Sequence, residues 1–547
     1  MAEINGGQAV ARQLKRAGID TAFGIVAGPM IEVMAAMQEE GIKVVNCRHE
    51  ISACFAASAW GYMTKKPGVV VAGSGPAVTN TVTGLHVATE SAMPLVVLGG
   101  STDSSARGLG GFQEADQMAF ARPGVKWMSQ VDRTERIPEL LHLALGKAVS
   151  GRPGGVYLDF PGQTVRRRLD ESEVLYRETA PRVTDPYPDP TGIEAIASML
   201  AGAERPLILI GKGAAWADAG DALTRLVDLG IPYVASPTAR GVVPDDNAMC
   251  MNAARSAALA GADTILMAGG RFNWIFQFGK APRFAQGVWL AQIDIVAEEM
   301  TSAAEVEVGL VADCRIAVEQ LVDALRGRTL RSAGTGWAAR LQEDSAKNAA
   351  SLQEQMNSDS TPINHYRLVS EVNNALPRQG NVTVDAELTM GVARAVLNRY
   401  EARSLLNSGT TGCMGTGVPY AMGLKLAQPD RPAIALVGDY AFGAAMTEVE
   451  TCARVGANVV FVVSNNGGIA GHSIQDRMFS ADSPPIAALL PVAYEKVAEM
   501  VGGFSRRVER PEDIRPAIDD ALAAHTVGVI NVMTDPKGGR RGSVYLQ

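Results

Sequence analysis

The sequence predicts an α/β protein of about three domains, each with a parallel β-sheet flanked by helices. The chain has 547 residues, which is too long for a single hydrophobic core. Short apolar runs, typical of buried parallel strands, alternate with helical patterns along most of the chain. Two polar stretches, 166–192 and 328–362, interrupt this alternation. The predicted domains are therefore 1–165, 193–327 and 363–547.

In the first region, helical patterns and apolar runs follow one another. Glu50 ends one of the apolar runs, in the sequence Arg-His-Glu. On the pattern alone this glutamate could also be an acid at a helix N-terminus, where the helix dipole favours negative charge. A turn of small residues, 73–76, follows a later strand. The predicted strands are 22–24, 44–50, 69–72, 95–99 and 155–160, and the predicted helices are 8–17 and 52–63.

The proline-rich stretch 166–192 predicts a linker to the second region. Strands are expected there at 206–210, 264–268 and 288–295, followed by a helix near 314–326. The charged stretch 328–362 predicts a connector that contains a helix. Three similar α/β units fit a chain built from duplicated Rossmann-like modules.

Composition excludes several classes of function. The net charge of −8 argues against a nucleic-acid-binding surface, although a local basic pocket for an anion remains open. Six scattered cysteines without metal-ligand spacing predict a reducing compartment. The N-terminus has no apolar signal core, and no apolar run approaches membrane-spanning length. We therefore expect a cytoplasmic protein with neither a membrane nor a nucleic acid as partner.

The stretch 432–468 carries the clearest chemical signal in the chain. An apolar run predicts a strand that ends at Gly438-Asp439, and a helical pattern follows. A second apolar run ends at Asn465-Asn466-Gly467-Gly468. This strand–turn–helix–strand order is typical of parallel sheets, and it brings both polar tips to the carboxyl edge of the sheet.

Oxygen donors at this edge suit a hard cation. Asp439 offers a carboxylate, Asn466 an amide oxygen and Gly468 a main-chain carbonyl. Mg²⁺ prefers such ligands and leaves its other positions to phosphate or water. The glycines allow main-chain N–H groups to approach a diphosphate. An ordinary crossover with a glycine turn and an asparagine-rich loop is the alternative interpretation.

The order GDYAFG followed by SNNGG resembles the GDG…NN signature of thiamine-diphosphate (ThDP) enzymes. By that resemblance, Asp439, Asn466 and the Gly468 carbonyl hold Mg²⁺ against the diphosphate, which the main chain at 438–441 also contacts. Tyr440 departs from the family, which usually has Gly or Ser there. The cofactor-binding residues implied in this stretch are Gly438, Asp439, Tyr440, Ala441, Asn466 and Gly468.

The resemblance assigns cofactor roles elsewhere as well. It implies that Glu50 pairs with N1′ of the aminopyrimidine ring. It places Met414, in the segment 408–417, beneath the cofactor, although a core methionine is the alternative. Leu388 stands where relatives have Asn, so Thr389 is expected to supply the polar contact.

Further motifs narrow the resemblance to the branch of 2-hydroxyacyl-CoA lyases and oxalyl-CoA decarboxylases, and they cover nearly the whole chain. This branch has the ThDP-binding fold, with pyrimidine-binding, CoA-binding and pyrophosphate-binding domains in that order. Its cofactor lies between the first domain of one subunit and the third of another, which implies a homodimer or homotetramer. The motifs are FQE at 112–114, GRPGGVYLD at 151–159, GKGAAW at 211–216, RGVVPD at 240–245, GRFNWIFQFG at 270–279 and PPIAALLP at 484–491.

In this branch the middle domain binds the adenine-nucleotide end of CoA. Lys212, Arg271 and Arg403 are cations suited to CoA phosphates, with Asn273 and Trp274 beside them. A solvated surface charge is the alternative for Arg403, and a structural role is the alternative for Arg271 and Trp274.

The resemblance implies a ThDP- and Mg²⁺-dependent carbon–carbon lyase that cleaves a 2-hydroxyacyl-CoA to formyl-CoA and an aldehyde or ketone. Gln113, Glu114 and His472 are candidates for handling the substrate hydroxyl, although His472 departs from the family and is otherwise a loop residue. The sequence FQE favours a lyase. Three alternatives remain open: an oxalyl-CoA decarboxylase, a CoA-independent carboligase, and a ThDP-fold subunit without catalysis.

Overall fold

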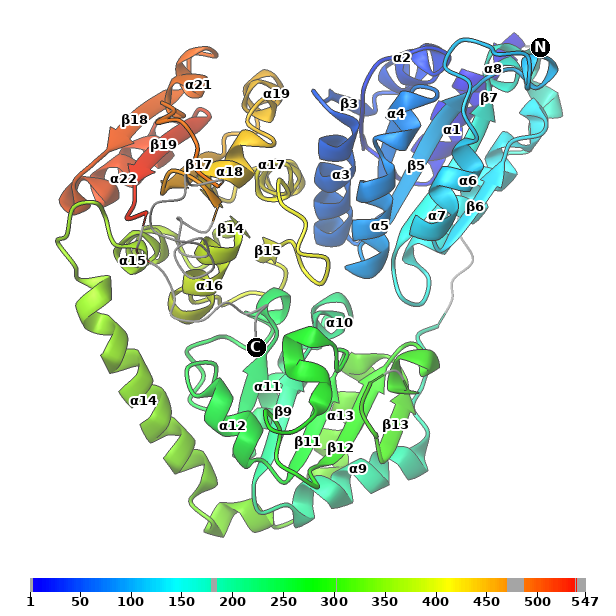
Figure 1. Cartoon of the computed structure of the whole chain (residues 1–547). Helices are drawn as coiled ribbons and strands as arrows, with labels where there is room; N and C mark the ends of the chain where they lie inside the picture. The colour runs from blue at the N-terminus through cyan, green and yellow to red at the C-terminus, as the bar shows by residue number, and fades with distance from the viewer. Residues whose placement is uncertain (1–2, 179–183, 302, 470–486, 537, 539–547) are drawn as a thin grey trace.

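A computed structural model describes residues 3–178, 184–301, 303–469, 487–536 and 538. It contains three parallel β-sheets, one in each predicted region, each flanked by helices (Figure 1). The first domain lies at the upper right of Figure 1, the third at the upper left, and the middle domain below them. These sheets confirm the predicted fold class.

The first sheet has six parallel strands in the order β3-β2-β4-β5-β7-β6. Its strands are β2 (Thr21–Gly24), β3 (Lys43–Asn46), β4 (Gly68–Ala72), β5 (Leu95–Ser101), β6 (Trp127–Gln130) and β7 (Gly155–Pro161). Its helices are α1 (Gly6–Arg16), α2 (Ile31–Glu39), α3 (Glu50–Thr64), α4 (Pro76–Thr79), α5 (Val82–Glu90), α6 (Gln117–Ala121), α7 (Ile137–Val149) and α8 (Gly162–Arg166).

In this domain the structure differs from the sequence prediction at the strand 44–50 and at the start of the predicted linker. The strand predicted at 44–50 ends at Asn46, and Glu50 instead begins helix α3, because His49 caps the helix by accepting a hydrogen bond from the Ile51 N–H at 3.2 Å. Part of the predicted linker is regular structure: β8 (Arg168–Asp170) pairs antiparallel with β1 (Glu3–Asn5). The start of the stretch 166–192 therefore packs with the first domain.

The middle sheet has five parallel strands in the order β10-β9-β11-β12-β13. They are β9 (Pro206–Ile210), β10 (Tyr233–Ala235), β11 (Thr264–Ala268), β12 (Trp289–Asp294) and β13 (Val308–Val311). The flanking helices are α9 (Pro190–Gly202), α10 (Lys212–Trp216), α11 (Gly220–Val227), α12 (Arg255–Gly261) and α13 (Cys314–Leu325).

The third sheet has six parallel strands in the order β15-β14-β16-β17-β19-β18. Counted along the chain, this is the strand order of the first sheet, as expected for duplicated modules. The strands are β14 (Asn381–Asp385), β15 (Leu405–Asn407), β16 (Ala433–Gly438), β17 (Val460–Asn465), β18 (Phe504–Val508) and β19 (Gly528–Met533). The helices are α15 (His365–Ala375), α16 (Glu387–Val396), α17 (Gly417–Ala427), α18 (Asp439–Gly443), α19 (Glu448–Val455), α21 (Lys496–Glu499) and α22 (Ile514–Ala523). The single helix predicted after Asp439 is thus two short helices, α18 and α19.

Helices α3 and α17 pack side by side and join the first domain to the third (Figure 1). Gly423 permits this close approach, because a Cβ there would lie 2.2 Å from the carbonyl oxygen of Ala56. The rings of Phe55 and Tyr420 meet edge to face, with their centroids 5.8 Å apart. The first and third domains of one chain are therefore packed directly against each other.

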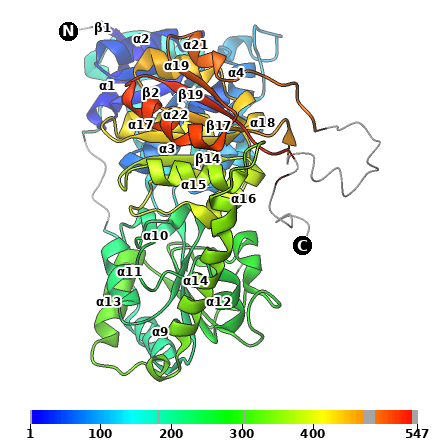
Figure 2. The same cartoon turned by 90° about the vertical axis from the view of Figure 1, so that its left-hand side faces the viewer.

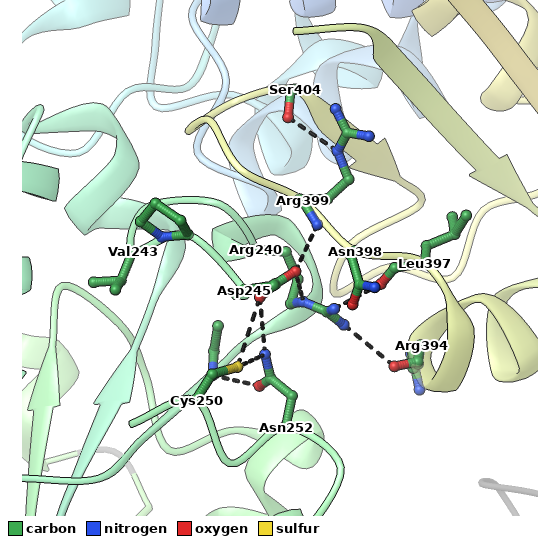
Figure 3. Close-up of polar contacts among 12 residues, drawn as sticks. Arg240, Val243, Asp245, Cys250, Asn252, Arg394, Leu397, Asn398, Arg399 and Ser404 are labelled. Atoms are coloured by element: carbon green, nitrogen blue, oxygen red, sulfur yellow. Dashed lines mark hydrogen bonds and ion pairs between the residues drawn. The ribbon is translucent and has the colours of Figure 1, made fainter. Parts of the chain in front are cut away.

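Helix α14 (Trp337–Met356) and a buried ion pair are among the contacts that join the middle domain to the third. The helix runs along the outside of the molecule from one domain to the other (Figures 1 and 2). On the inner side, the buried pair Arg240–Asp245 of the middle domain binds the main chain of the third (Figure 3). Arg240 donates to the Leu397 carbonyl at 2.6 Å, and Asp245 accepts from the Arg399 N–H at 2.6 Å.

None of the helices in the described part of the chain has the length and apolar content that a membrane crossing requires.

Candidate functional site

A cavity of about 230 Å³ opens at the carboxyl edge of the third sheet, and we call it the third-domain cavity. It gathers residues that follow four different strands. After the chain leaves β14 it crosses to the edge strand β15 and returns to β16, so β14 and β16 flank a topological switch point, the usual position of a ligand in such sheets. The lining is Asp385, Ala386, Glu387, Leu388, Thr389, Met390, Ser408, Gly412, Met414, Gly438, Asp439, Tyr440, Ser464, Asn466, Gly468 and Ile469.

Asp439 lines this cavity and is only 2% exposed. Its Oδ2 accepts hydrogen bonds from the main-chain N–H groups of Gly467 at 2.8 Å and Gly468 at 3.0 Å. Its Oδ1 accepts from the Tyr440 N–H at 2.7 Å. The end of β16 and the loop after β17 are thereby held together by one carboxylate.

The loop after β17 requires glycine. Gly467 has a φ of 78° and Gly468 a φ of 151°, in the region that side chains disfavour. A Cβ on Gly468 would also lie 2.1 Å from the carbonyl oxygen of Ala487. This backbone sets Asn466, which is 7% exposed, and Gly468 beside Asp439.

The donors of the third-domain cavity fit a magnesium ion. Asp439, Asn466 and the Gly468 main chain all offer oxygen, the atom that Mg²⁺ prefers. Burial raises the pKa of Asp439, and a bound cation would offset that cost of burying the charge. In the described residues no group of three or more His, Cys, Asp or Glu side chains could hold a metal, so an ion here would need the amide and main-chain oxygens as well.

The structure brings most of the predicted cofactor residues to this one cavity. Thr389 is 4% exposed, and Leu388, Met414 and Tyr440 also line the wall. Tyr440, the predicted departure from the ThDP signature, is 40% exposed and carries a full side chain into the lining of the cavity. Ala441 is buried and lies outside the lining, so only its main chain could take part.

Glu50, Gln113 and Glu114 lie at the carboxyl edge of the first sheet and do not line the third-domain cavity. Glu50 is 7% exposed and accepts a hydrogen bond from Asn80 at 3.0 Å. Gln113 has a φ of 56° and accepts a hydrogen bond from the Ser74 hydroxyl at 2.9 Å. Asn80 and Ser74 flank the short helix α4, so Glu50 and Gln113 share one edge of the domain.

The carboxylate of Glu114 is bound by its own loop. It accepts hydrogen bonds from the N–H groups of Gly108, Gly110 and Gly111, the last two at 3.0 Å. These bonds, that of Gly108 foremost, lower the pKa of Glu114. His472, the third candidate for handling the substrate hydroxyl, lies outside the described residues.

A second cavity, of about 380 Å³, lies where the three domains meet, and we call it the middle cavity. Its floor is the carboxyl edge of the middle sheet, because it is lined by residues that follow each of the five strands. Residues 90–93 and 149–153 of the first domain and 407, 409 and 410 of the third complete its wall.

Two arginines share one glutamate in the middle cavity. Arg152 donates to Glu299 at 3.0 Å and Arg271 donates to the same Oε1 at 3.3 Å. Both also donate to the Glu90 carbonyl at 2.9 Å. Burial lowers the pKa of Arg152, with Arg271 adding to the effect. Such a charged, largely pre-formed wall is suited to an anionic ligand.

The five residues predicted to bind CoA are not all brought together. Lys212, Arg271 and Asn273 line the middle cavity, but Trp274 and Arg403 do not. Trp274 Nε1 donates to the Thr410 carbonyl at 2.9 Å. Arg403, which has a left-handed backbone with a φ of 66°, donates to the Ala215 carbonyl of α10 at 2.9 Å and to Asp218 at 2.7 Å.

Lys212 lines the middle cavity, but its ammonium group is already engaged. It donates to the carbonyls of Ser91 at 2.6 Å and Ala92 at 2.7 Å, and lies 3.8 Å from the centre of the Tyr62 ring. Burial lowers its pKa well below the usual value. Its predicted contact with a phosphate would require one of these partners to be released or shared.

Sequence reasoning missed Arg152 and Asp294, which both line the middle cavity. Arg152 belongs to the motif GRPGGVYLD, which supported the family resemblance, but no binding role was predicted for it. Asp294 ends β12, and an acid at the carboxyl end of a predicted strand could have indicated a site residue. Burial raises the pKa of Asp294 to about 6.

Three family models, each described as a domain of a thiamine pyrophosphate enzyme, match this chain. The N-terminal TPP binding domain matches residues 4–120, the central domain 193–321, and the C-terminal TPP binding domain 387–532. The three sheets and the oxygen-lined cavity agree with these matches. Fold and site together define a thiamine pyrophosphate enzyme.

Similarity to characterised proteins extends over almost the entire chain. A 2-hydroxyacyl-CoA lyase of Oryza sativa subsp. japonica is 34% identical, with 98% of this chain and 96% of the relative aligned. An oxalyl-CoA decarboxylase of Escherichia coli (strain K12) is 32% identical, with 97% and 95% aligned. An acetolactate synthase large subunit of Mycobacterium tuberculosis is 32% identical, with 97% and 96% aligned. The chain belongs to the thiamine-diphosphate-dependent 2-hydroxyacyl-CoA lyase and oxalyl-CoA decarboxylase family.

Proposed function

We propose that this protein is a ThDP- and Mg²⁺-dependent lyase that cleaves a 2-hydroxyacyl-CoA into formyl-CoA and an aldehyde or ketone. The observation that carries the proposal is that one loop, 407–414, lines both cavities. Asn407, Gly409 and Thr410 face the middle cavity, whereas Ser408, Gly412 and Met414 face the third-domain cavity. A CoA thioester has a nucleotide at one end and the reacting carbonyl at the other, so it matches two sites that share a wall.

The third-domain cavity would hold the cofactor. Asp439, Asn466 and the Gly468 carbonyl would bind Mg²⁺, and the main chain at the start of α18 would face the diphosphate. Thr389 would replace the polar contact that Leu388 lacks, and Met414 would contact the rings. When bound, ThDP supplies a carbon nucleophile and accepts the electron pair released by carbon–carbon cleavage.

Glu50 would reach this cavity from a second copy of the chain. Glu50, Gln113 and Glu114 lie on the carboxyl edge of the first sheet, and large apolar side chains stand exposed nearby. Phe112 is 89% exposed and Leu109 is 79% exposed, and a second subunit would cover them. We therefore infer a homodimer or homotetramer with each active site at an interface.

Among the residues proposed for the substrate hydroxyl, Gln113 and His472 remain the candidates. The Glu114 carboxylate is occupied by three N–H groups of its own loop, so its proposed role is to hold Gln113 and Phe112 in place. The nucleotide end of CoA would occupy the middle cavity, where Arg152 and Arg271 offer cationic groups and Asn273 a polar one.

Product analysis tests the substrate. Purified protein loaded with ThDP and Mg²⁺ would be given a 2-hydroxyacyl-CoA, oxalyl-CoA or pyruvate in separate reactions. Formyl-CoA together with an aldehyde or ketone from the first reaction supports the lyase. Formyl-CoA and carbon dioxide from oxalyl-CoA alone would establish a decarboxylase, and acetolactate from pyruvate would establish a carboligase. Absence of Mg²⁺-dependent ThDP binding in calorimetry would show a subunit that has lost catalysis.

The free state of all six cysteines supports a reducing, cytoplasmic location for this enzyme.

A further inference from the structure

Glu448 is a buried acid whose partners belong to another domain. It begins helix α19 in the third domain, and its side chain is 0% exposed. Its Oε1 accepts hydrogen bonds from the main-chain N–H groups of Arg48 at 3.0 Å and His49 at 3.2 Å. Its Oε2 accepts from the Thr451 hydroxyl at 2.7 Å. The two N–H groups lie in the first domain, immediately before Glu50.

The turn held by Glu448 has further contacts with α19. Arg454 donates to the Asn46 carbonyl at 2.5 Å, and Lys43 donates to the Val455 carbonyl at 3.1 Å. Both ends of α19 are therefore bound to the segment from β3 to the start of α3. Glu448 is the part of this contact that reaches closest to Glu50 along the chain.

A carboxylate is an unusual choice for such a buried position. Burial raises the pKa of Glu448, and its hydrogen bonds with Thr451, Arg48, Ser52 and His49 oppose that rise. A buried carboxylate needs a hydrogen-bond donor for each of its oxygens. The N–H groups that donate to it are therefore held at a set distance and in a set direction. The neighbouring Glu450 is partly exposed to solvent and forms ion pairs with Arg454 on its own helix and, at 3.9 Å, with the Arg48 side chain, but within the described part of the chain it accepts no hydrogen bond from the N–H groups of the turn.

We propose that Glu448 is a positioning residue that fixes the turn before α3 and thereby aims the Glu50 carboxylate at the cofactor. The proposal rests on the role of Glu50 in the proposed function. Glu448 follows Asp439 in the connection between β16 and β17, so one segment carries a metal ligand at one end and supports Glu50 at the other. In the proposed dimer, Asp439 and Glu50 of one chain belong to different active sites. Glu448 connects the segment that carries Asp439 to the turn that carries Glu50.

Two conservative variants distinguish the position of the Glu448 carboxylate from its charge. Glu448→Gln keeps an oxygen that can accept from Arg48 and His49 but removes the charge. Glu448→Asp keeps the charge but withdraws the carboxylate by one methylene. We expect kcat to fall by about tenfold or more in Glu448→Asp and by no more than about threefold in Glu448→Gln, with KM and the ThDP Kd nearly unchanged in both. Glu450→Gln, on the same helix, removes the charge that pairs with the Arg48 side chain but no hydrogen bond to the turn, so it is the matched control and should retain wild-type turnover.

A spectroscopic measurement examines Glu50 directly. The circular dichroism of the bound aminopyrimidine ring, followed against pH in the holoenzyme, reports the protonation that Glu50 controls. Its midpoint should shift in Glu448→Asp and stay in place in Glu448→Gln and Glu450→Gln. A structural role that only holds the domains together would lower the melting temperature without moving this midpoint.

The outcomes that contradict the proposal are equally definite. Normal turnover in Glu448→Asp, or equal losses in both variants, would overturn it, as would a loss confined to Glu448→Gln. Amide hydrogen exchange at Arg48 and His49 gives a second test if Glu448→Asp does not fold. Slow exchange in the wild type and in Glu448→Gln supports the proposal, and fast exchange in the wild type contradicts it.

These spectroscopic and exchange measurements need the cofactor but no substrate. If the wild type bound ThDP and failed to cleave 2-hydroxyacyl-CoA, the proposed substrate would be refuted and the test of Glu448 would stand.

Discussion

Arg403 of the third domain donates a hydrogen bond to Asp218 of the middle domain at 2.7 Å. The other carboxylate oxygen of Asp218 accepts from Lys65 of the first domain, also at 2.7 Å. One carboxylate therefore binds cations from the two other domains. The ring of Trp216 lies beneath, 5.6 Å from the Lys65 ammonium group and stacked on Tyr62.

Asp218→Asn should weaken the junction of the three domains. Because the Asp218 side chain is 50% exposed, each ion pair contributes little, and we expect a loss of about 1 kcal/mol that shrinks at high salt. Melting temperature at low and high sodium chloride measures the effect. Asp344→Asn, at an exposed position on α14, is the control and should melt like the wild type.

Asp245→Asn should destabilise the protein far more. Asp245 is almost fully buried, pairs with Arg240 at 2.7 Å and accepts from the Arg399 N–H (Figure 3). Removing its charge leaves Arg240 buried without a counter-ion, which costs about 3 kcal/mol. The midpoint of urea unfolding should fall accordingly. The adjacent Asp246→Asn, which breaks only the exposed pair with Arg378, should change it little, and equal effects would argue against this account.

Glu50→Gln should remove activity without unfolding the protein. An amide keeps the shape of the side chain and its contact with Asn80, but it cannot share a proton with the aminopyrimidine ring. We expect kcat to fall by more than about 100-fold with an unchanged melting temperature. Glu139→Gln, in the first turn of α7 in the same domain, is the matched control. Near-normal turnover in Glu50→Gln would refute the assigned role.

Arg271→Ala should impair the use of CoA substrates specifically. Arg271 lines the middle cavity, so its loss should raise KM for a 2-hydroxyacyl-CoA by about tenfold while kcat changes little. A substrate analogue without the nucleotide should show no such increase. Arg283→Ala removes an arginine that binds Ser256 outside the cavity lining, and it should leave both KM values unchanged.

Asp294→Asn should stabilise the ligand-free protein at neutral pH. Burial raises the pKa of Asp294 to about 6, above the ordinary value, so the folded state disfavours the charged form. Its contribution to stability is therefore present at acid pH and lost as the pH rises through about 6. The variant should gain about 2 kcal/mol at pH ~7.5 and nothing near pH ~4. A gain of equal size at both pH values would contradict this assignment.

The sequence patterns located the sheets well because buried parallel strands are apolar throughout. The run at 264–268 matches β11 (Thr264–Ala268) in both bounds. Some edge strands carry polar side chains and give no such run: β6 has the sequence WMSQ and β18 has FSRRV, and neither was predicted. The central strands β14 (NVTVD) and β19 (GVINVM) were not predicted either, because polar residues interrupt their apolar runs. The start of α3 was misplaced because an apolar run does not show where a strand ends, whereas the His49 cap does.

The candidate site could be predicted where its residues directly follow neighbouring strands in the sequence. Asp439, Asn466 and Gly468 are placed by two adjacent parallel strands, and they share one cavity. The partners of Lys212 and Arg403 depend on how whole domains pack, and no short pattern encodes that packing. Lys212 instead binds carbonyl groups of the first domain, and Arg403 binds Asp218 of the middle domain.

Helix α14 has a fixed span because its two ends are anchored and the Arg240–Asp245 pair clamps the same two domains on the other side. Trp337 and Leu341 pack into the middle domain, and Met356 packs against the third. One inserted residue would turn the two ends out of phase by about 100° and lengthen the strut by ~1.5 Å. An insertion of about seven residues would restore the phase but lengthen the helix by roughly 10 Å, so the clamped span should not accommodate a change in the length of α14.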